Sequence, residues 1–158
     1  MLKTYIHFIM NSYTEEVGNK LNALLEKNYD AEKGYKKAAE NTKNTALKNY
    51  FNRKANERYD FGHQLKSEIR NFGEDPKESG SATGTAHRAW MDVKAIFSAD
   101  NEESMLEEAI RGEKASVEEY NEVLNEASLP TSTRDLVLNQ KNTISQELNT
   151  IKRMEDIQ

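Results

Sequence analysis

The chain has 158 residues and no cysteine, which fits one domain with a single core and excludes disulfide bonds, thiolate metal sites and cysteine nucleophiles. With 36% hydrophobic and 31% charged residues, it has the balance of a protein whose helices each bury one stripe and expose the rest. The net charge of −5 comes from residues 80–158, which carry 8 basic and 15 acidic side chains, so we expect no nucleic-acid partner.

Residues 1–13 are predicted to be an N-terminal extension, and residues 14–158 a single four-helix-bundle domain. The apolar run from Tyr5 to Met10 is too short to cross a membrane and lacks the small-residue cleavage site of a secretory signal. No other stretch of the chain approaches the roughly 20 apolar residues that a membrane span needs. We therefore expect a cytoplasmic protein without membrane contacts.

The first predicted helix covers residues 14–40, and Ser12 with Glu15 would begin it as a capping box. Apolar or small residues recur in it at intervals of three or four, which marks one helical face. This stripe contains Val17, Leu21, Leu24, Ala31, Tyr35 and Ala38, with Asn28 in the remaining place. The second predicted helix covers residues 42–72 and repeats the spacing with Leu47, Phe51, Phe61, Leu65 and Phe72. Lys54, Arg58 and Glu68 occupy the other stripe positions.

The connection that follows begins with residues 73–84, which are predicted to form a loop because they contain Pro76, three glycines and no apolar residue larger than alanine. Residues 85–97 are predicted to form a short helix, with Trp90, Val93 and Phe97 on one side. The connection is therefore predicted to contain a short extra helix.

The third predicted helix covers residues 100–127, with Asp100 and Glu103 as its capping box and Glu113 at the centre of its apolar face. The fourth begins at Thr131 or Ser132, just past Pro130. Its stripe contains Val137, Ile144, Leu148, Ile151 and Met154, with Gln140 and Glu147 on the same face or at its edge. No segment shows the alternation typical of a strand.

The lengths of the connections indicate the topology. Short links within the first and second pairs of helices predict two antiparallel hairpins, whereas about 28 residues separate the pairs. Two hairpins joined by one long crossover give a ferritin-like antiparallel four-helix bundle. The alternative is an up-down bundle with the short helix packed across one end.

Polar residues at stripe positions are predicted to form a buried layer, because an unpaired buried charge costs several kcal/mol. The members of this layer are Asn28, Lys54, Arg58, Glu113, Gln140 and Glu147, with Glu32 beside them. We favour an interpretation in which Lys54 and Arg58 pair with Glu113, Glu32 and Glu147 and fix the register of the helices.

A metal site is the competing interpretation, because carboxylates from facing helices at mid-bundle bind iron or manganese pairs. The candidate ligands are Glu113, Glu57, Glu32 and His87. The second and fourth helices lack the Glu-x-x-His pair of such sites, and Lys54 and Arg58 place positive charge where the metal ions would lie. No residues group as a nucleophile, base and orienting acid, so we predict no catalytic residue.

Several residues together resemble an uncharacterised bacterial family of ferritin-like four-helix-bundle proteins, distantly similar to rubrerythrin and ferritin. They are Leu21-Asn22, Leu24-Leu25, Asp30, Gly34-Tyr35, Ala38-Ala39-Glu40, Glu57-Arg58, Glu68, Gly73, Pro76, Gly80-Ser81, His87-Arg88, Trp90, Arg111-Gly112-Glu113, Tyr120, Leu129-Pro130 and Gln140. The resemblance implies a ferritin-like bundle and a stress-associated bacterial protein. That family usually has Glu-Arg-Gly-Glu in the third helix, and Ile110 stands here in place of the first glutamate.

The leading functional hypothesis is a ferritin-like protein with a non-catalytic role and a polar or degenerate metal site, assembled as a dimer or larger oligomer. One alternative is a di-iron or di-manganese carboxylate oxidase or an iron-handling protein. The other is a helical module that binds a partner protein.

Overall fold

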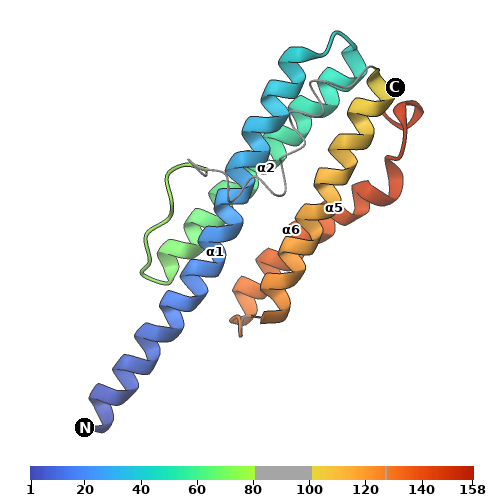
Figure 1. Cartoon of the computed structure of the whole chain (residues 1–158). Helices are drawn as coiled ribbons and strands as arrows, with labels where there is room; N and C mark the ends of the chain where they lie inside the picture. The colour runs from blue at the N-terminus through green and yellow to red at the C-terminus, as the bar shows by residue number, and fades with distance from the viewer. Residues whose placement is uncertain (81–100, 127) are drawn as a thin grey trace.

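The computed structural model describes residues 1–80, 101–126 and 128–158, and within these ranges it is helical and contains no strand. The helices are α1 (Leu2–Asn41), α2 (Thr45–Asn71), α5 (Glu102–Glu126) and α6 (Thr131–Thr150), and a 3-10 turn, η1 (Met154–Asp156), follows them (Figure 1). The predicted all-α bundle is therefore confirmed. The short helix predicted over residues 85–97 lies outside the described residues, and none of the described helices could cross a membrane.

Contacts between helices give their directions. Tyr35 on α1 bonds to Glu113 on α5, and Tyr13 on α1 bonds to the carbonyl of Ser128, just past the end of α5, so residue numbers rise on one helix as they fall on the other. The same reversal relates α2 to α6, because Glu68 contacts Thr133 and Lys54 contacts Glu147. Since α1 and α2 form an antiparallel pair, α2 and α5 run in the same direction.

Local signals define both ends of α2. At its start, the side chain of Asn44 accepts a hydrogen bond of 2.9 Å from the Leu47 amide. At its end, Gly73 takes a positive φ of 73°, which glycine adopts without steric cost. The Gly73 and Glu74 amides then bond back to the carbonyls of Arg70 and Ile69, a pattern that ends helices in a left-handed residue.

The first helix begins at Leu2, so the prediction that it starts at residue 14 is wrong. Ser12 and Glu15 lie inside the continuous helix, where the backbone amides are already bonded along the helix and need no side-chain cap. The helix has 40 residues, whereas α2 has 27, and its N-terminal end extends beyond the other helices in Figure 1.

The structure also corrects two boundaries in the second half. The side chain of Asn101 caps α5 by accepting a hydrogen bond of 2.8 Å from the Ser104 amide, while Asp100, the predicted cap, lies outside the described residues. Glu103 accepts a hydrogen bond from the Met154 amide instead of completing a capping box. Helix α6 ends at Thr150, so the predicted stripe residues Ile151 and Met154 lie past the helix, and Met154 reaches the core from the 3-10 turn.

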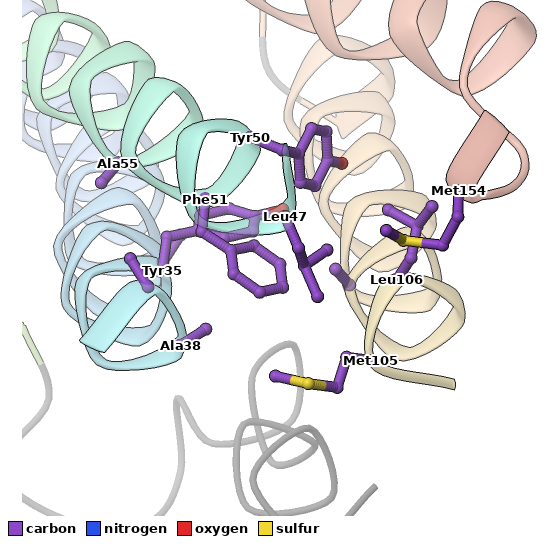
Figure 2. Packing of buried hydrophobic residues seen from close by; sticks show 12 residues of the cluster. Tyr35, Ala38, Leu47, Tyr50, Phe51, Ala55, Met105, Leu106 and Met154 are labelled. Carbon is purple, nitrogen blue, oxygen red and sulfur yellow. The ribbon is translucent and has the colours of Figure 1, made fainter. Parts of the chain in front are cut away.

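Two apolar clusters fill the bundle, one toward each end. The first contains Tyr35, Phe51 and Leu106, and Figure 2 shows Met154 beside Leu106 in it. The second contains Val17, Leu21, Leu24, Leu25, Phe61, Leu65, Ile69, Tyr120, Val123, Val137 and Ile144. All four of the described α-helices supply side chains to the second cluster, so their buried stripes face one another as predicted.

Candidate functional site

Charged side chains lie between the two apolar clusters, and we call them the charged layer. It consists of Lys54, Glu57 and Arg58 from α2, Glu113 from α5 and Glu147 from α6. Lys54, Arg58 and Glu113 are buried, and Glu57 and Glu147 are half-buried at the edge. A charge in such a place needs a partner of opposite sign, and the layer supplies one for each member.

Glu113 receives three contacts from two helices. Its Oε1 accepts a hydrogen bond of 2.6 Å from the Arg58 guanidinium and another of 2.6 Å from the Tyr35 hydroxyl. Its Oε2 lies 3.0 Å from the Lys54 ammonium, as an ion pair without well-directed hydrogen-bond geometry. Glu113 therefore joins both buried cations of α2 to α5.

The Lys54 ammonium is the centre of the layer. It contacts the carboxylates of Glu57, Glu113 and Glu147, which come from three different helices. Carboxylate oxygens of these residues lie within 4.8 Å of one another, a separation that would be repulsive without a cation between them. Arg53 binds the outer side of Glu147, with its own side chain half in solvent.

A chain of neutral hydrogen bonds continues from the charged layer into the second apolar cluster. Arg58 donates to the Asn28 side-chain oxygen at 3.2 Å, and the Asn28 amide donates to the Tyr120 hydroxyl at 2.8 Å. Tyr120 donates to Gln140 at 2.7 Å, and the Gln140 amide donates to Gln64 and to the Phe61 carbonyl. Each of these buried polar side chains thus has a partner on another helix.

Opposite charges shift the pKa values within the layer. Burial alone would raise the pKa of Glu113, but Arg58, Lys54 and the Tyr35 hydrogen bond lower it to about 2. Burial would lower the pKa of Lys54, yet the charge of Glu113 above all raises it. For Glu57 burial outweighs the attraction of Lys54, so its pKa is raised. Glu113 and Lys54 are thus both ionised at neutral pH.

The lowered pKa of Glu113 predicts acid sensitivity. Because its pKa falls from 4.5 to about 2 on folding, the stabilisation is complete above about pH 4.5 and is lost as pH falls toward 2. The shift corresponds to on the order of 3 kcal/mol. Urea unfolding across this pH range is expected to show the loss, and the Glu113→Gln variant, which cannot titrate there, is expected to show a much smaller one. An equal loss in that variant would contradict the assignment to Glu113.

The structure brings most of the predicted layer together, with one exception. Asn28, Lys54, Arg58, Glu113 and Gln140 are all buried and lie in one connected network. Glu32 does not reach Lys54 and instead binds Lys36, one turn along α1. The predicted pairing of Glu32 with Lys54 is therefore wrong.

The structure brings only some of the candidate metal ligands together. Glu57 and Glu113 meet, and the third carboxylate beside them is Glu147. Glu32 lies apart from this group, and His87 lies outside the described residues. Ile110 packs against the first apolar cluster.

These residues do not fit a metal pair. The described carboxylate cluster has no histidine in it, and an ammonium group already contacts all three of its members. Arg58 adds a second fixed positive charge on Glu113. A divalent ion would therefore face two cations within the same cluster.

Sequence reasoning missed several contacts in the layer. Tyr35 and Tyr120 looked like ordinary apolar stripe residues, yet their hydroxyls bond to Glu113 and Gln140. A buried tyrosine generally needs a partner for its hydroxyl, so their place beside polar stripe residues was the available signal. The contact of Glu57 with Lys54 follows from their spacing of three residues on one helix.

The chain matches the model of a protein family for which no activity is described. The family described as "Domain of unknown function (DUF2383)" matches residues 16–126, and no curated protein matches the chain. The matched segment supplies Lys54, Arg58 and Glu113, whereas Gln140 and Glu147 lie beyond it. Because the match covers most of the chain, this protein belongs to the DUF2383 family.

Proposed function

We propose that this protein is a ferritin-like bundle with a non-catalytic role, in which its own side-chain cations take the place that metal ions occupy in the di-metal proteins of that fold. The helix directions support the ferritin-like part of the proposal. Since α2 and α5 run in the same direction, α5 begins at the end of the bundle where α2 also begins, as the corresponding helices do in ferritin-like bundles.

The contact of Lys54 with three carboxylates carries the proposal. Its ammonium lies among Glu57, Glu113 and Glu147, the position from which a metal ion would bind the same oxygens. The pKa of Lys54 is raised, so at neutral pH it does not give up its proton to make room for a metal ion. A metal ion would have to displace a charged side chain that is already bound to the site.

The charge count of the layer supports the same conclusion. Two cations and three carboxylates make up the layer, and Arg53 binds the outer side of Glu147, so the layer together with Arg53 is neutral without any added ion. Two divalent ions would leave four excess positive charges in a largely buried space, which is costly at low dielectric.

Metal analysis tests the proposal directly. Protein purified without chelator from iron- and manganese-supplemented cultures is expected to contain only substoichiometric metal by mass spectrometry. Anaerobic titration with ferrous ion is expected to give no saturable heat, and addition of oxygen is expected to give ferrous oxidation at the rate of buffer.

About two iron or manganese ions per chain, or saturable ferrous oxidation, would overturn the proposal. The Glu113→Gln variant is the control for location, because it removes the central carboxylate of the layer. Metal that remains bound in this variant would lie elsewhere on the chain and would leave the assignment of the layer intact.

A further inference from the structure

The N-terminal segment of α1, residues 2–13, lies outside the bundle. Burial along α1 begins at Val17, and every residue from 1 to 13 is exposed. Figure 1 shows this segment, in dark blue, projecting past the ends of the other described helices. A difference of 13 residues between α1 and α2 corresponds to about 20 Å of helix.

The exposed surface of this segment is mostly apolar. Its large side chains expose between 37% and 74% of their surface, and they are Leu2, Tyr5, Ile6, Phe8, Ile9, Met10 and Tyr13. Lys3 is the one Lys, Arg, Asp or Glu residue among residues 2–13. Among the described residues, the other large exposed hydrophobic side chains are Met1, Tyr59 and Leu138, so most of this surface is concentrated at one end of the chain.

The apolar stripe of the segment continues the buried stripe of the bundle. Leu2, Ile6, Ile9 and Tyr13 follow one another at intervals of three or four residues, and Val17 comes four residues later. From Val17 onward the same face is covered by α2, α5 and α6. The segment therefore presents a helical interface of the same kind as the bundle's, without its partner helices.

We propose that residues 2–13 pair with the same segment of a second copy, as an antiparallel helical interface with two-fold symmetry. The exposed stripe and its neighbours offer on the order of 600 Å² per chain, taking roughly 200 Å² for a large side chain. Two copies would bury about 1,200 Å² in total, the lower end of the range for stable interfaces. This inference does not depend on the charged layer.

The position of the bundle selects the antiparallel orientation. A partner helix on the stripe of residues 2–13 lies on the same side of α1 as the helices that cover Val17 and Leu21. In a parallel pair it would continue into the space that these helices occupy. In an antiparallel pair the N-terminal end of the partner helix lies beside this bundle, and the partner's own bundle lies at the opposite end of the paired segments.

The same constraint indicates the register. Tyr13 is bonded to Ser128 at the end of the bundle, so a partner helix has room up to the level of Tyr13. Placing the partner's Leu2 at that level puts Ile6 opposite the partner's Ile9. Lys3 then lies close to the partner's Glu15 and Glu16, which are of opposite charge.

Sedimentation of the full chain over a wide concentration range tests the dimer. The wild type is expected to show a concentration-dependent monomer–dimer equilibrium. The double variant Ile6→Glu, Ile9→Glu is expected to weaken it by about a hundredfold or more, because it would bury unpaired charges. Leu138→Glu is the matched control, since Leu138 is an exposed apolar residue on α6, and it should leave the equilibrium unchanged.

Disulfide trapping tests the antiparallel orientation of the two segments. Because the chain has no native cysteine, every disulfide formed must join the introduced residues. An equimolar mixture of the Ile6→Cys and Ile9→Cys variants is expected to form cross-linked heterodimers more readily than either variant alone. Leu2→Cys is expected to stay unlinked, because antiparallel pairing in this register separates the two Leu2 positions by about 16 Å along the axis.

Three results would overturn the proposal. A wild-type chain that remains monomeric at high concentration would exclude the dimer, and efficient cross-linking of Leu2→Cys would exclude the antiparallel arrangement. Co-sedimentation of a monomeric wild type with phosphatidylcholine or phosphatidylglycerol vesicles, lost in the double variant, would assign the segment to a lipid surface. Thermal melts of all variants should match the wild type, because the altered side chains are exposed.

Discussion

Replacing Arg58 by leucine is expected to lower the free energy of unfolding by about 3–5 kcal/mol. The guanidinium is almost fully buried and donates to Glu113 and to Asn28. Leucine fills part of its volume but leaves one oxygen of Glu113 with the Tyr35 hydroxyl as its remaining donor. Urea unfolding at neutral pH measures the loss.

Arg53→Leu is the matched control for this variant. Arg53 also binds a carboxylate, that of Glu147, but 51% of its side chain is exposed, against 1% for Arg58. A half-exposed pair contributes at most about 1 kcal/mol. If Arg58→Leu lowers the free energy of unfolding no more than Arg53→Leu does, the ion pair of Arg58 and Glu113 is not buried in solution.

A double-mutant cycle separates the pair from the rest of the network. Glu113→Gln is expected to cost less in the Arg58→Leu background than in the wild type, because the unpaired carboxylate has then been removed. Equal costs in the two backgrounds would mean that Arg58 and Glu113 contribute independently.

Lys54→Met is expected to destabilise the protein by about 3–5 kcal/mol at neutral pH and to create a divalent-ion site. Methionine has a similar length, but without the ammonium three carboxylates within 4.8 Å repel one another. The pKa of Glu57, raised already in the wild type, rises further in this variant. Its stability should therefore increase as pH falls from neutral toward about 5.

Manganese ion should restore stability to Lys54→Met by about 2–3 kcal/mol at a hundredfold excess over its dissociation constant. Unfolding in urea with manganese chloride, and then with chelator, measures this effect. Lys36→Met is the matched control, because Lys36 pairs with Glu32 on the exposed face of α1. A variant that is equally stable with and without manganese would show that the three carboxylates do not form a usable site.

The sequence was sufficient to predict the four described α-helices, the buried stripes and most members of the polar network at mid-bundle. Spacing of three and four residues marks these features, and a polar residue in such a stripe needs partners on other helices. Asn28, Lys54, Arg58, Glu113 and Gln140 could therefore be identified before their contacts were known.

The choice of partners and the helix starts could not be predicted in the same way. Glu57 lies three residues from Lys54 on the same helix, whereas Glu32 lies on α1 and binds Lys36. Whether Glu32 reaches Lys54 depends on how α1 packs against α2. Ser12 and Glu15 fit a capping box, but a cap forms only where the chain leaves the helix, and the helix continues back to Leu2. Residue spacing within one segment contains no information on how two helices pack or on how far a helix continues.

The arrangement of the charged layer has a consequence for how the bundle opens. Lys54 and Arg58 are tied to α5 through Glu113, to α6 through Glu147 and to α1 through Asn28. No single helix can detach without stranding an ionised or hydrogen-bonding group in apolar surroundings. Partly opened forms are therefore penalised more than in an all-apolar core, and the helices are expected to separate together in one cooperative step.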